Sequence, residues 1–150
     1  MDFSADIVEE LVQELSQALA NNYVLYVKTL NCHWNVEDPR FLFLHEMFQD
    51  QYEAIAKNGD DIAERIGQMG KRVDASLRTF LHDSKIHEIE SALSANEMLR
   101  ELYKDHKKII IHLRQVIGKS DKYHDPGLTD LLSDILLFHE KTAWIINRHC

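Results

Sequence analysis

The sequence predicts an all-α protein: a bundle of four long helices with one long crossover connection that contains a short helix. The 150 residues include only five Gly and two Pro, so long segments lack helix breakers. Four segments carry apolar residues at helical spacing and are rich in helix-favouring Leu, Ala, Glu, Gln and Lys. One connection, residues 71–92, is too long for a simple turn. The length suits a single compact domain over residues 1–150.

The first two helices are expected to be joined by a short loop. The first begins after Ser4, a residue type favoured at the N-cap, and runs to about Trp34. The second begins at Asp38-Pro39, because Asp can cap a helix and Pro can occupy its first position, and it ends at Gly67 or Gly70. Their apolar stripes consist of Ile7, Leu11, Leu15, Leu19, Tyr23, Tyr26 and Leu30, and of Phe41, Leu44, Phe48, Tyr52, Ile55, Ile62 and Ile66.

The second half of the chain begins with the crossover. Its short apolar-periodic piece, Ile86 to Leu93, is interpreted as a small helix. The third long helix opens with a capping box of Ser94 and Glu97 and is expected to stop at Gly118. The fourth follows Asp125-Pro126. A crossover lets the second and third long helices run parallel, and four helices with one long crossover describe a ferritin-like bundle.

Composition excludes several classes of protein. The chain has no apolar run long enough to span a bilayer, and its acidic N-terminus does not resemble a standard secretion signal. Cys32 and Cys150 are isolated, so both are expected to be free thiols, and a cytoplasmic location follows. The formal net charge of −8 argues against a general attraction to nucleic acid.

Four residues in the first half have the chemistry of metal ligands: His33, His45, Asp60 and Glu64. Asp60 and Glu64 are spaced i and i+4, so they share a helix face and can hold one cation with hard oxygens. His45 and Asp60 lie on the same predicted helix, and fifteen residues separate them by roughly 22 Å. Since a metal–ligand bond spans only about 2 Å, one site using all four must be completed by a second copy across a two-fold axis.

Simpler interpretations exist for each of these residues. A lone His on an apolar face is more often a packed, hydrogen-bonded residue than a ligand. Asp60 and Glu64 beside Arg65 are also compatible with a solvated helix face carrying ion pairs. The sequence contains no Glu-x-x-His motif, so a di-iron centre within a single bundle is not expected. The remaining histidines show no paired ligand spacing and are expected to be surface or structural residues.

The local pattern around these residues resembles a known family. Residues 33–65 are similar to the signature H-W…F-x-x-L-H-x-x-F…Y…D-x-x-A-E-R of the Dps family, the twelve-subunit mini-ferritins. The C-terminal part resembles the family's D-L-L and H-E-K-x-A-W segments, so the likeness covers nearly the whole chain. The matching residues are His33, Trp34, Phe41, Leu44, His45, Phe48, Tyr52, Asp60, Ala63, Glu64 and Arg65, then Asp130-Leu131-Leu132 and His139-Glu140-Lys141-Thr142-Ala143-Trp144.

The resemblance implies a ferroxidase centre between two subunits. Its iron ligands would be His33, His45 and position 49 of one subunit, with Asp60 and Glu64 of the neighbour. Position 49 departs from the family pattern because it holds Gln49 rather than an acidic residue. A neutral amide oxygen can coordinate, but it lacks the charge and bridging capacity of a carboxylate. We therefore expect one tight iron position and one weak one near His45 and Gln49.

The resemblance also implies a function: Fe(II) enters a hollow homo-dodecamer, is oxidised by hydrogen peroxide and is stored as a ferric mineral. Asp130, Asp125 and Asp121 would line a pore that admits cations, although Asp125 before Pro126 is equally suited to capping a helix. Glu46 would help nucleate the mineral. Trp34 and Tyr52 would absorb stray oxidising equivalents, or serve only as core residues.

Two other functions remain open. Gln49 allows a non-catalytic, Dps-like stress-protection cage that kept the fold and lost turnover. Direct coating of DNA is the third hypothesis for the function, and we do not expect it. Family members that bind DNA directly often use a flexible basic tail, whereas this N-terminus is short and acidic, and phosphate binding requires several cations together.

Overall fold

The computed structural model describes residues 3–150, and that range contains five α-helices and no strand. The all-α prediction is therefore confirmed. Four of the helices are long and one is short. They are α1 (Ala5–Asn35), α2 (Phe41–Gln68), α3 (Leu77–Asp83), α4 (Ala95–Lys122) and α5 (Pro126–Asn147).

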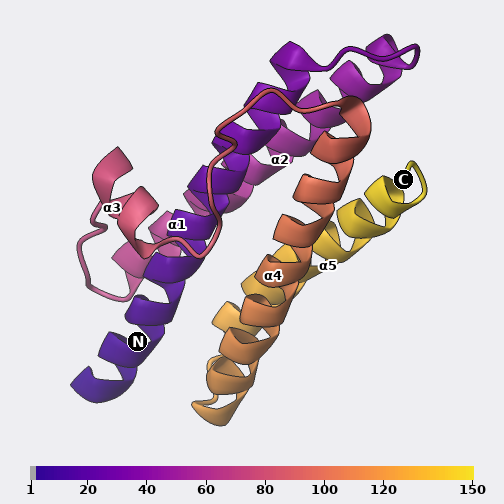
Figure 1. The fold of residues 1–150 in the computed structure, drawn as a ribbon. Helices are drawn as coiled ribbons and strands as arrows, with labels where there is room; N and C mark the ends of the chain where they lie inside the picture. The colour runs from indigo at the N-terminus through magenta and orange to yellow at the C-terminus, as the bar shows by residue number, and fades with distance from the viewer. Residues whose placement is uncertain (1–2) are drawn as a thin grey trace.

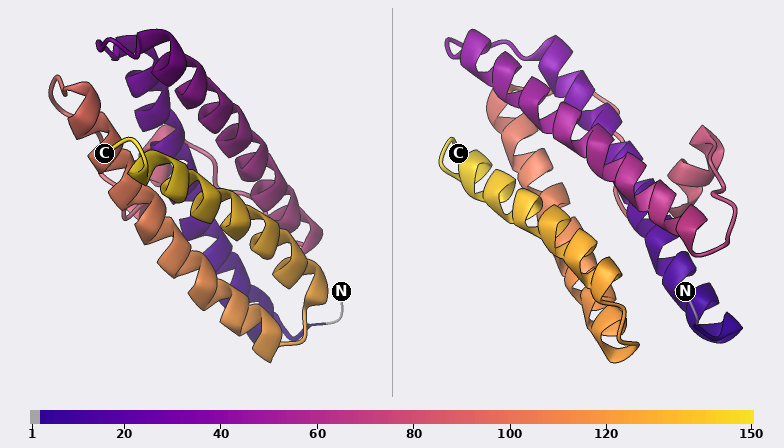
Figure 2. Two further views of the ribbon diagram at one scale, coloured as in Figure 1. Left: turned by 90° about the vertical axis from the view of Figure 1, so that its right-hand side faces the viewer. Right: turned by 180° about the vertical axis from the view of Figure 1, so that it is seen from behind.

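The four long helices form a bundle of two antiparallel hairpins, α1 with α2 and α4 with α5 (Figure 1). The views in Figure 2 show α2 and α5 on one side of the bundle and α1 and α4 on the other. The crossover carries α3 against α1 and returns the chain to the end where α2 began, so α2 and α4 run parallel as expected. None of the helices within residues 3–150 combines the length and apolar character that a membrane span requires.

Most helix ends follow the predicted capping chemistry. The Ser4 hydroxyl accepts a hydrogen bond from the Ile7 amide at the start of α1. Ser94 and Glu97 form a complete capping box at α4. Asp125 caps α5 by accepting from the Leu128 amide, with Pro126 in the first turn. These side chains satisfy amide groups that have no partner inside the helix.

The start of α2 differs from the prediction. The helix begins at Phe41 rather than at Asp38-Pro39, and its N-cap position is Arg40. The Asp38 carboxylate accepts hydrogen bonds from the backbone amide and the guanidinium of Arg40, each 2.8 Å long. This local turn holds the chain outside the helix for three further residues. At the other end, Gly70 adopts a φ of 83° just beyond the helix, which is the expected role of a terminating glycine.

Two further boundaries were predicted wrongly. The short helix of the crossover lies at Leu77–Asp83 with Ser76 as its N-cap, not between Ile86 and Leu93, which is irregular chain. Ile86 is nevertheless buried. Its apolar side chain therefore indicates packing against the core and does not indicate a helix. The α4 helix passes Gly118 and ends at Lys122, because one glycine inside a long helix costs only about 1 kcal/mol.

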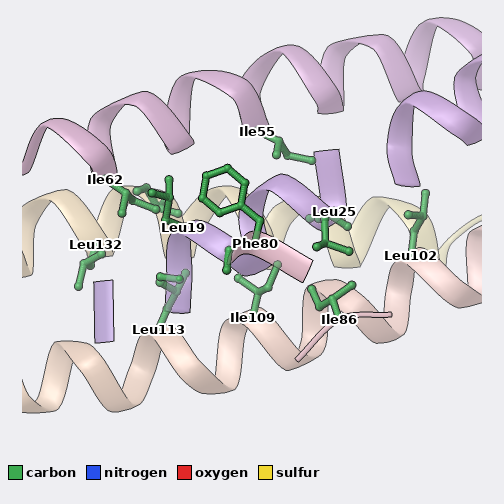
Figure 3. Packing of buried hydrophobic residues seen from close by; sticks show 14 of the residues in the cluster. Leu19, Leu25, Ile55, Ile62, Phe80, Ile86, Leu102, Ile109, Leu113 and Leu132 are labelled. Carbon is green, nitrogen blue, oxygen red and sulfur yellow. The ribbon is translucent and has the colours of Figure 1, made fainter. Parts of the chain in front are cut away.

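The core runs along the length of the bundle. Figure 3 shows side chains from α1, α2, α4 and α5 meeting at its centre, with Phe80 of α3 and Ile86 of the crossover beside them. The α1 and α2 helices approach each other closely at Gly59. A Cβ atom on Gly59 would lie 2.7 Å from the side-chain nitrogen Nδ2 of Asn22. That nitrogen donates to the Ile55 carbonyl. The labelled core residues are Leu19, Leu25, Ile55, Ile62, Phe80, Ile86, Leu102, Ile109, Leu113 and Leu132.

A buried ion pair joins the two hairpins. Lys28 of α1 is only 2% exposed, and its ammonium lies 2.5 Å from the Asp105 carboxylate and 3.3 Å from that of Glu101, both on α4. Burial raises the pKa of Asp105, while the hydrogen bond from Lys28 opposes that shift. Breaking such a pair would leave an uncompensated charge in the core, so it fixes how α4 sits on α1.

Two histidines lie in the interior between α4 and α5. The Nδ1 atoms of His106 and His139 are 2.9 Å apart, so one ring donates and the other accepts. Burial lowers the pKa of His106 to about 3. Burial, followed by the charge of a protonated His106, also lowers the pKa of His139. Both rings are therefore neutral structural residues, as expected for histidines without paired ligand spacing. The two cysteines are free, with Cys32 buried and Cys150 exposed.

We predict that acid destabilises the fold through His106. In the unfolded chain this ring is protonated below about pH 6.5. In the folded chain it is protonated only below about pH 3. Stability is therefore lost as the pH falls through that window. Going from about pH 7 to about pH 5 should cost ~2 kcal/mol at this residue, measured by urea unfolding at fixed protein concentration. His106→Gln should remove this part of the loss and keep the part that the buried His139 contributes, while His82→Gln, at an exposed site, should change neither. An unchanged pH dependence in His106→Gln would contradict the assignment.

Candidate metal centre

His33 and His45 are brought together where α1 passes into α2. The Nδ1 atom of each ring lies 2.7 Å from the backbone carbonyl oxygen of the other residue. The rings are stacked, with centroids 3.8 Å apart and an angle of 14° between their planes. A carbonyl oxygen can only accept, so both Nδ1 atoms carry the proton and donate. In the neutral ring with its proton on Nδ1, the Nε2 lone pair is free, and this is the tautomer that binds a metal through Nε2.

The other end of α2 carries a cluster of carboxylates. Ligand oxygens of Asp60, Asp61 and Glu64 all lie within 4.8 Å of one another. Asp60 and Glu64 are exposed, whereas Asp61 is half-buried and accepts a hydrogen bond from Lys57. The sequence prediction included Asp60 and Glu64 and missed Asp61, although its position directly after Asp60 could have drawn attention to it. The arrangement suits a hard divalent cation.

The two parts of the predicted site stay apart within one chain. Among residues 3–150, the only group of three or more potential ligands close enough to share an ion is the carboxylate cluster, and it contains no histidine. The α2 helix runs unbroken from Phe41 to Gln68, which keeps His45 and Asp60 roughly 22 Å apart along its axis. One chain therefore holds an imidazole half at one end of α2 and a carboxylate half at the other.

Gln49 lies one turn beyond His45 and is half-buried. Its side-chain nitrogen donates a 3.0 Å hydrogen bond to a carboxylate oxygen of Glu53. This bond directs the amide nitrogen along the helix and leaves the amide oxygen as the atom able to coordinate a cation. Glu53 was not among the predicted site residues, although its spacing of four from Gln49 could have indicated the contact. Glu46 and Asp50, on either side, are exposed.

The three aspartates around the start of α5 lie in different environments. Asp125 is only 4% exposed and forms a 2.7 Å ion pair with Arg65 of α2, in addition to capping α5. Asp121 accepts a hydrogen bond from the Thr129 hydroxyl. Asp130 is exposed. Asp125 is thus committed to structural contacts in this chain, and the other two carboxylates remain at the surface.

Arg65 connects the carboxylate end of α2 to the start of α5. The Arg65 guanidinium passes close to Gly127. A Cβ atom at Gly127 would lie 3.1 Å from a guanidinium nitrogen. The ion pair with Asp125 and this close approach place Glu64, the neighbour of Arg65, beside the α4–α5 turn. Asp61, Glu64, Arg65 and Gly127 border a shallow hollow there.

Comparisons with known proteins identify similar sequences and folds. Residues 12–150 match a family model described as a ferritin-like domain. The chain is 31% identical to the DNA protection during starvation protein 2 of Bacillus anthracis, over 92% of this chain and 94% of the relative. It superposes on a Dps protein from Bacillus brevis with a TM-score of 0.94 and 31% identity, covering 98% and 99% of the two chains.

A third match bears on metal chemistry. The Dps protein from Vibrio cholerae O1 superposes with a TM-score of 0.91 and 26% identity, covering 95% of this chain and 90% of that one. That protein is described as a member of a broad superfamily of ferritin-like diiron-carboxylate proteins.

We predict that both His33 and His45 are Nδ1–H tautomers in the metal-free protein. Each Nδ1 is held by a carbonyl, which fixes the proton there. Nitrogen chemical shifts of ¹⁵N-histidine-labelled protein at neutral pH should show this tautomer for both rings, with assignment by the His33→Gln and His45→Gln variants. An Nε2–H tautomer at either residue would contradict the reciprocal hydrogen bonds.

Proposed function

This chain belongs to the Dps family of the ferritin-like superfamily, and we propose that it oxidises Fe(II) with hydrogen peroxide and stores the ferric product inside a hollow shell of twelve copies. Membership of the family supports iron storage and stress protection in general terms. The oxidant, the number of subunits and the ligands are our proposal. The observation that carries it is the His33–His45 pair, whose Nε2 atoms are both free to bind a cation.

In the proposed centre, His33, His45 and Gln49 of one subunit face Asp60 and Glu64 of a two-fold-related copy. Each half is present in every chain, and the length of α2 prevents the two halves of one chain from meeting. A two-fold axis places the imidazole end of one copy against the carboxylate end of the other, and it creates two equivalent sites. Imidazole with carboxylate is a ligand set suited to iron.

The substrates are iron and peroxide, and the side chains hold and orient the ions. Two Fe(II) ions each give up one electron, and one hydrogen peroxide takes both and two protons to form two water molecules. Carboxylates from the neighbouring copy offset the charge that iron gains on oxidation. Gln49 contributes an amide oxygen without charge, so the second ion should be held more weakly than the first.

Fe(II) must enter the shell, and the oxidised iron must then move from the centre to the mineral. We assign entry first to Asp130, which is exposed at the start of α5, and then to Asp121. Asp125 would support the pore indirectly, by capping α5 and holding Arg65. Glu46 is exposed directly after His45 and is proposed to help nucleate the mineral.

A non-catalytic cage is the second candidate function, and the Gln49–Glu53 hydrogen bond favours it. That bond holds the amide nitrogen against Glu53 and leaves only a neutral oxygen for a cation, which is a weaker ligand than a carboxylate. Direct DNA binding has no comparable support, because each copy carries a formal charge of −8.

We predict that anaerobic Fe(II) oxidation by hydrogen peroxide is fast in the wild type and at least about tenfold slower in Glu64→Ala, since a ligand is lost. Gln49→Asp should speed oxidation by strengthening the second position. Asp50→Ala, one residue away and about 100° around the helix, is the matched control and should behave as the wild type. If only Gln49→Asp turns over, the protein is a cage whose centre has been switched off.

We also predict that two inactive variants restore each other. Mixed and reassembled His33→Ala and Glu64→Ala chains should regain about a quarter of the wild-type sites. Random pairing makes half of the dimers mixed, and each mixed dimer has one intact site of two. A site within one chain would regain nothing on mixing. Fe(II) oxidation and binding of Co(II), followed by absorbance, would both measure the recovery.

A further inference from the structure

A continuous row of aromatic rings leads away from the histidine pair. Tyr52 of α2 makes an edge contact with His33, at a centroid distance of 5.2 Å. Tyr26 of α1 lies 5.9 Å from Tyr52, and Tyr23 lies 6.3 Å from Tyr26, again edge to face. Tyr23 is stacked on Phe80 of α3 at 4.8 Å. All three tyrosines are half-buried along the α1–α2 hairpin, and each contact is within the range of direct aromatic interaction.

The family resemblance already implies that Tyr52 takes up oxidising equivalents. We propose that Tyr26 and Tyr23 extend this role into a relay, which carries a one-electron oxidising equivalent from Tyr52 to Tyr23 and stores it there. The proposal rests on the iron oxidation proposed above, and it addresses a chemical problem created by Gln49. Peroxide needs two electrons, whereas a single bound Fe(II) supplies one. Since we expect the second position to be weakly held, the first iron would often be oxidised alone.

The electron balance of the relay is complete. One Fe(II) gives an electron to hydrogen peroxide, the O–O bond breaks, and hydroxide and a hydroxyl radical form. The Tyr52 phenol gives that radical an electron and its proton, producing water and a tyrosyl radical. Tyr26 and then Tyr23 pass an electron back along the row, each losing its phenolic proton to water as its neighbour regains one. A second Fe(II), with a proton from water, finally reduces the radical to tyrosine.

The ends of the row give the relay its direction. Phe41 is stacked on His45 at 5.1 Å, on the opposite side of the histidine pair. Phe80 closes the far end beyond Tyr23. Phenylalanine has no phenolic proton to release and is much harder to oxidise than tyrosine. Of the two rings that contact the histidine pair in the described part of the chain, Tyr52 and Phe41, only Tyr52 carries a phenol, so the relay starts at Tyr52 and ends at Tyr23.

The first test locates the radicals. Anaerobic protein carrying one Fe(II) per subunit is mixed with hydrogen peroxide and a nitroso spin trap, and the adducts are mapped by mass spectrometry. We expect adducts on Tyr52 and Tyr23 in the wild type. Tyr26→Phe, which keeps the ring and removes only the hydroxyl, should lose the Tyr23 adduct and keep that of Tyr52. Tyr52→Phe should lose both. The control Tyr103→Phe, on α4 and outside the row, should leave the pattern unchanged.

A second test separates the relay from iron chemistry. A ruthenium photo-oxidant is attached at position 34 through Trp34→Cys in a Cys150→Ser background, where Cys32 is buried and does not react. Light then delivers the oxidising equivalent beside His33 without iron. The same dependence of the Tyr23 radical on Tyr26 is expected. If it appears here while iron oxidation equals that of Glu64→Ala, the iron proposal fails and the relay stands. If Tyr23 is oxidised equally in Tyr26→Phe, the relay is wrong.

Discussion

The reciprocal hydrogen bonds between His33 and His45 are the interaction on which the α1–α2 connection and the candidate metal centre depend. Each side chain closes onto the backbone of the other residue across the α1–α2 connection. These bonds hold the end of one helix against the start of the next and fix both tautomers. They also place the His33 ring against Tyr52. Helix packing, the proposed metal binding and the start of the aromatic row thus depend on the same pair of residues.

The fold was largely predictable because long helices are encoded locally. Apolar stripes and caps such as Ser4, Ser94 and Asp125 located the four main elements. The errors arose where a contact outside the local pattern decided the outcome. The Asp38–Arg40 interaction delays α2. The burial of Ile86 reflects packing of irregular chain, which periodicity alone cannot distinguish from a short helix.

The candidate site was predictable in part. Spacing and helix rise predicted that the histidines and the carboxylates lie far apart, because this separation follows from sequence position along one helix. Their role as metal ligands stays a prediction. The mutual bonding of the histidines and the contact of Tyr26 with Tyr52 depend on how two helices pack, so no spacing in the sequence reveals them. The Gln49–Glu53 bond is a different case, since an i, i+4 pair is visible in the sequence.

The burial of Cys32 has a consequence for how long the protein can work. Its neighbour in sequence is His33, so this thiol lies close to where peroxide is proposed to be consumed. Burial raises its pKa to about 12, so only about one molecule in a hundred thousand carries the thiolate at neutral pH. The thiolate is the form that peroxide attacks on the way to irreversible sulfinic and sulfonic acids. The high pKa thereby protects this cysteine, next to the proposed centre, from oxidation over many reaction cycles.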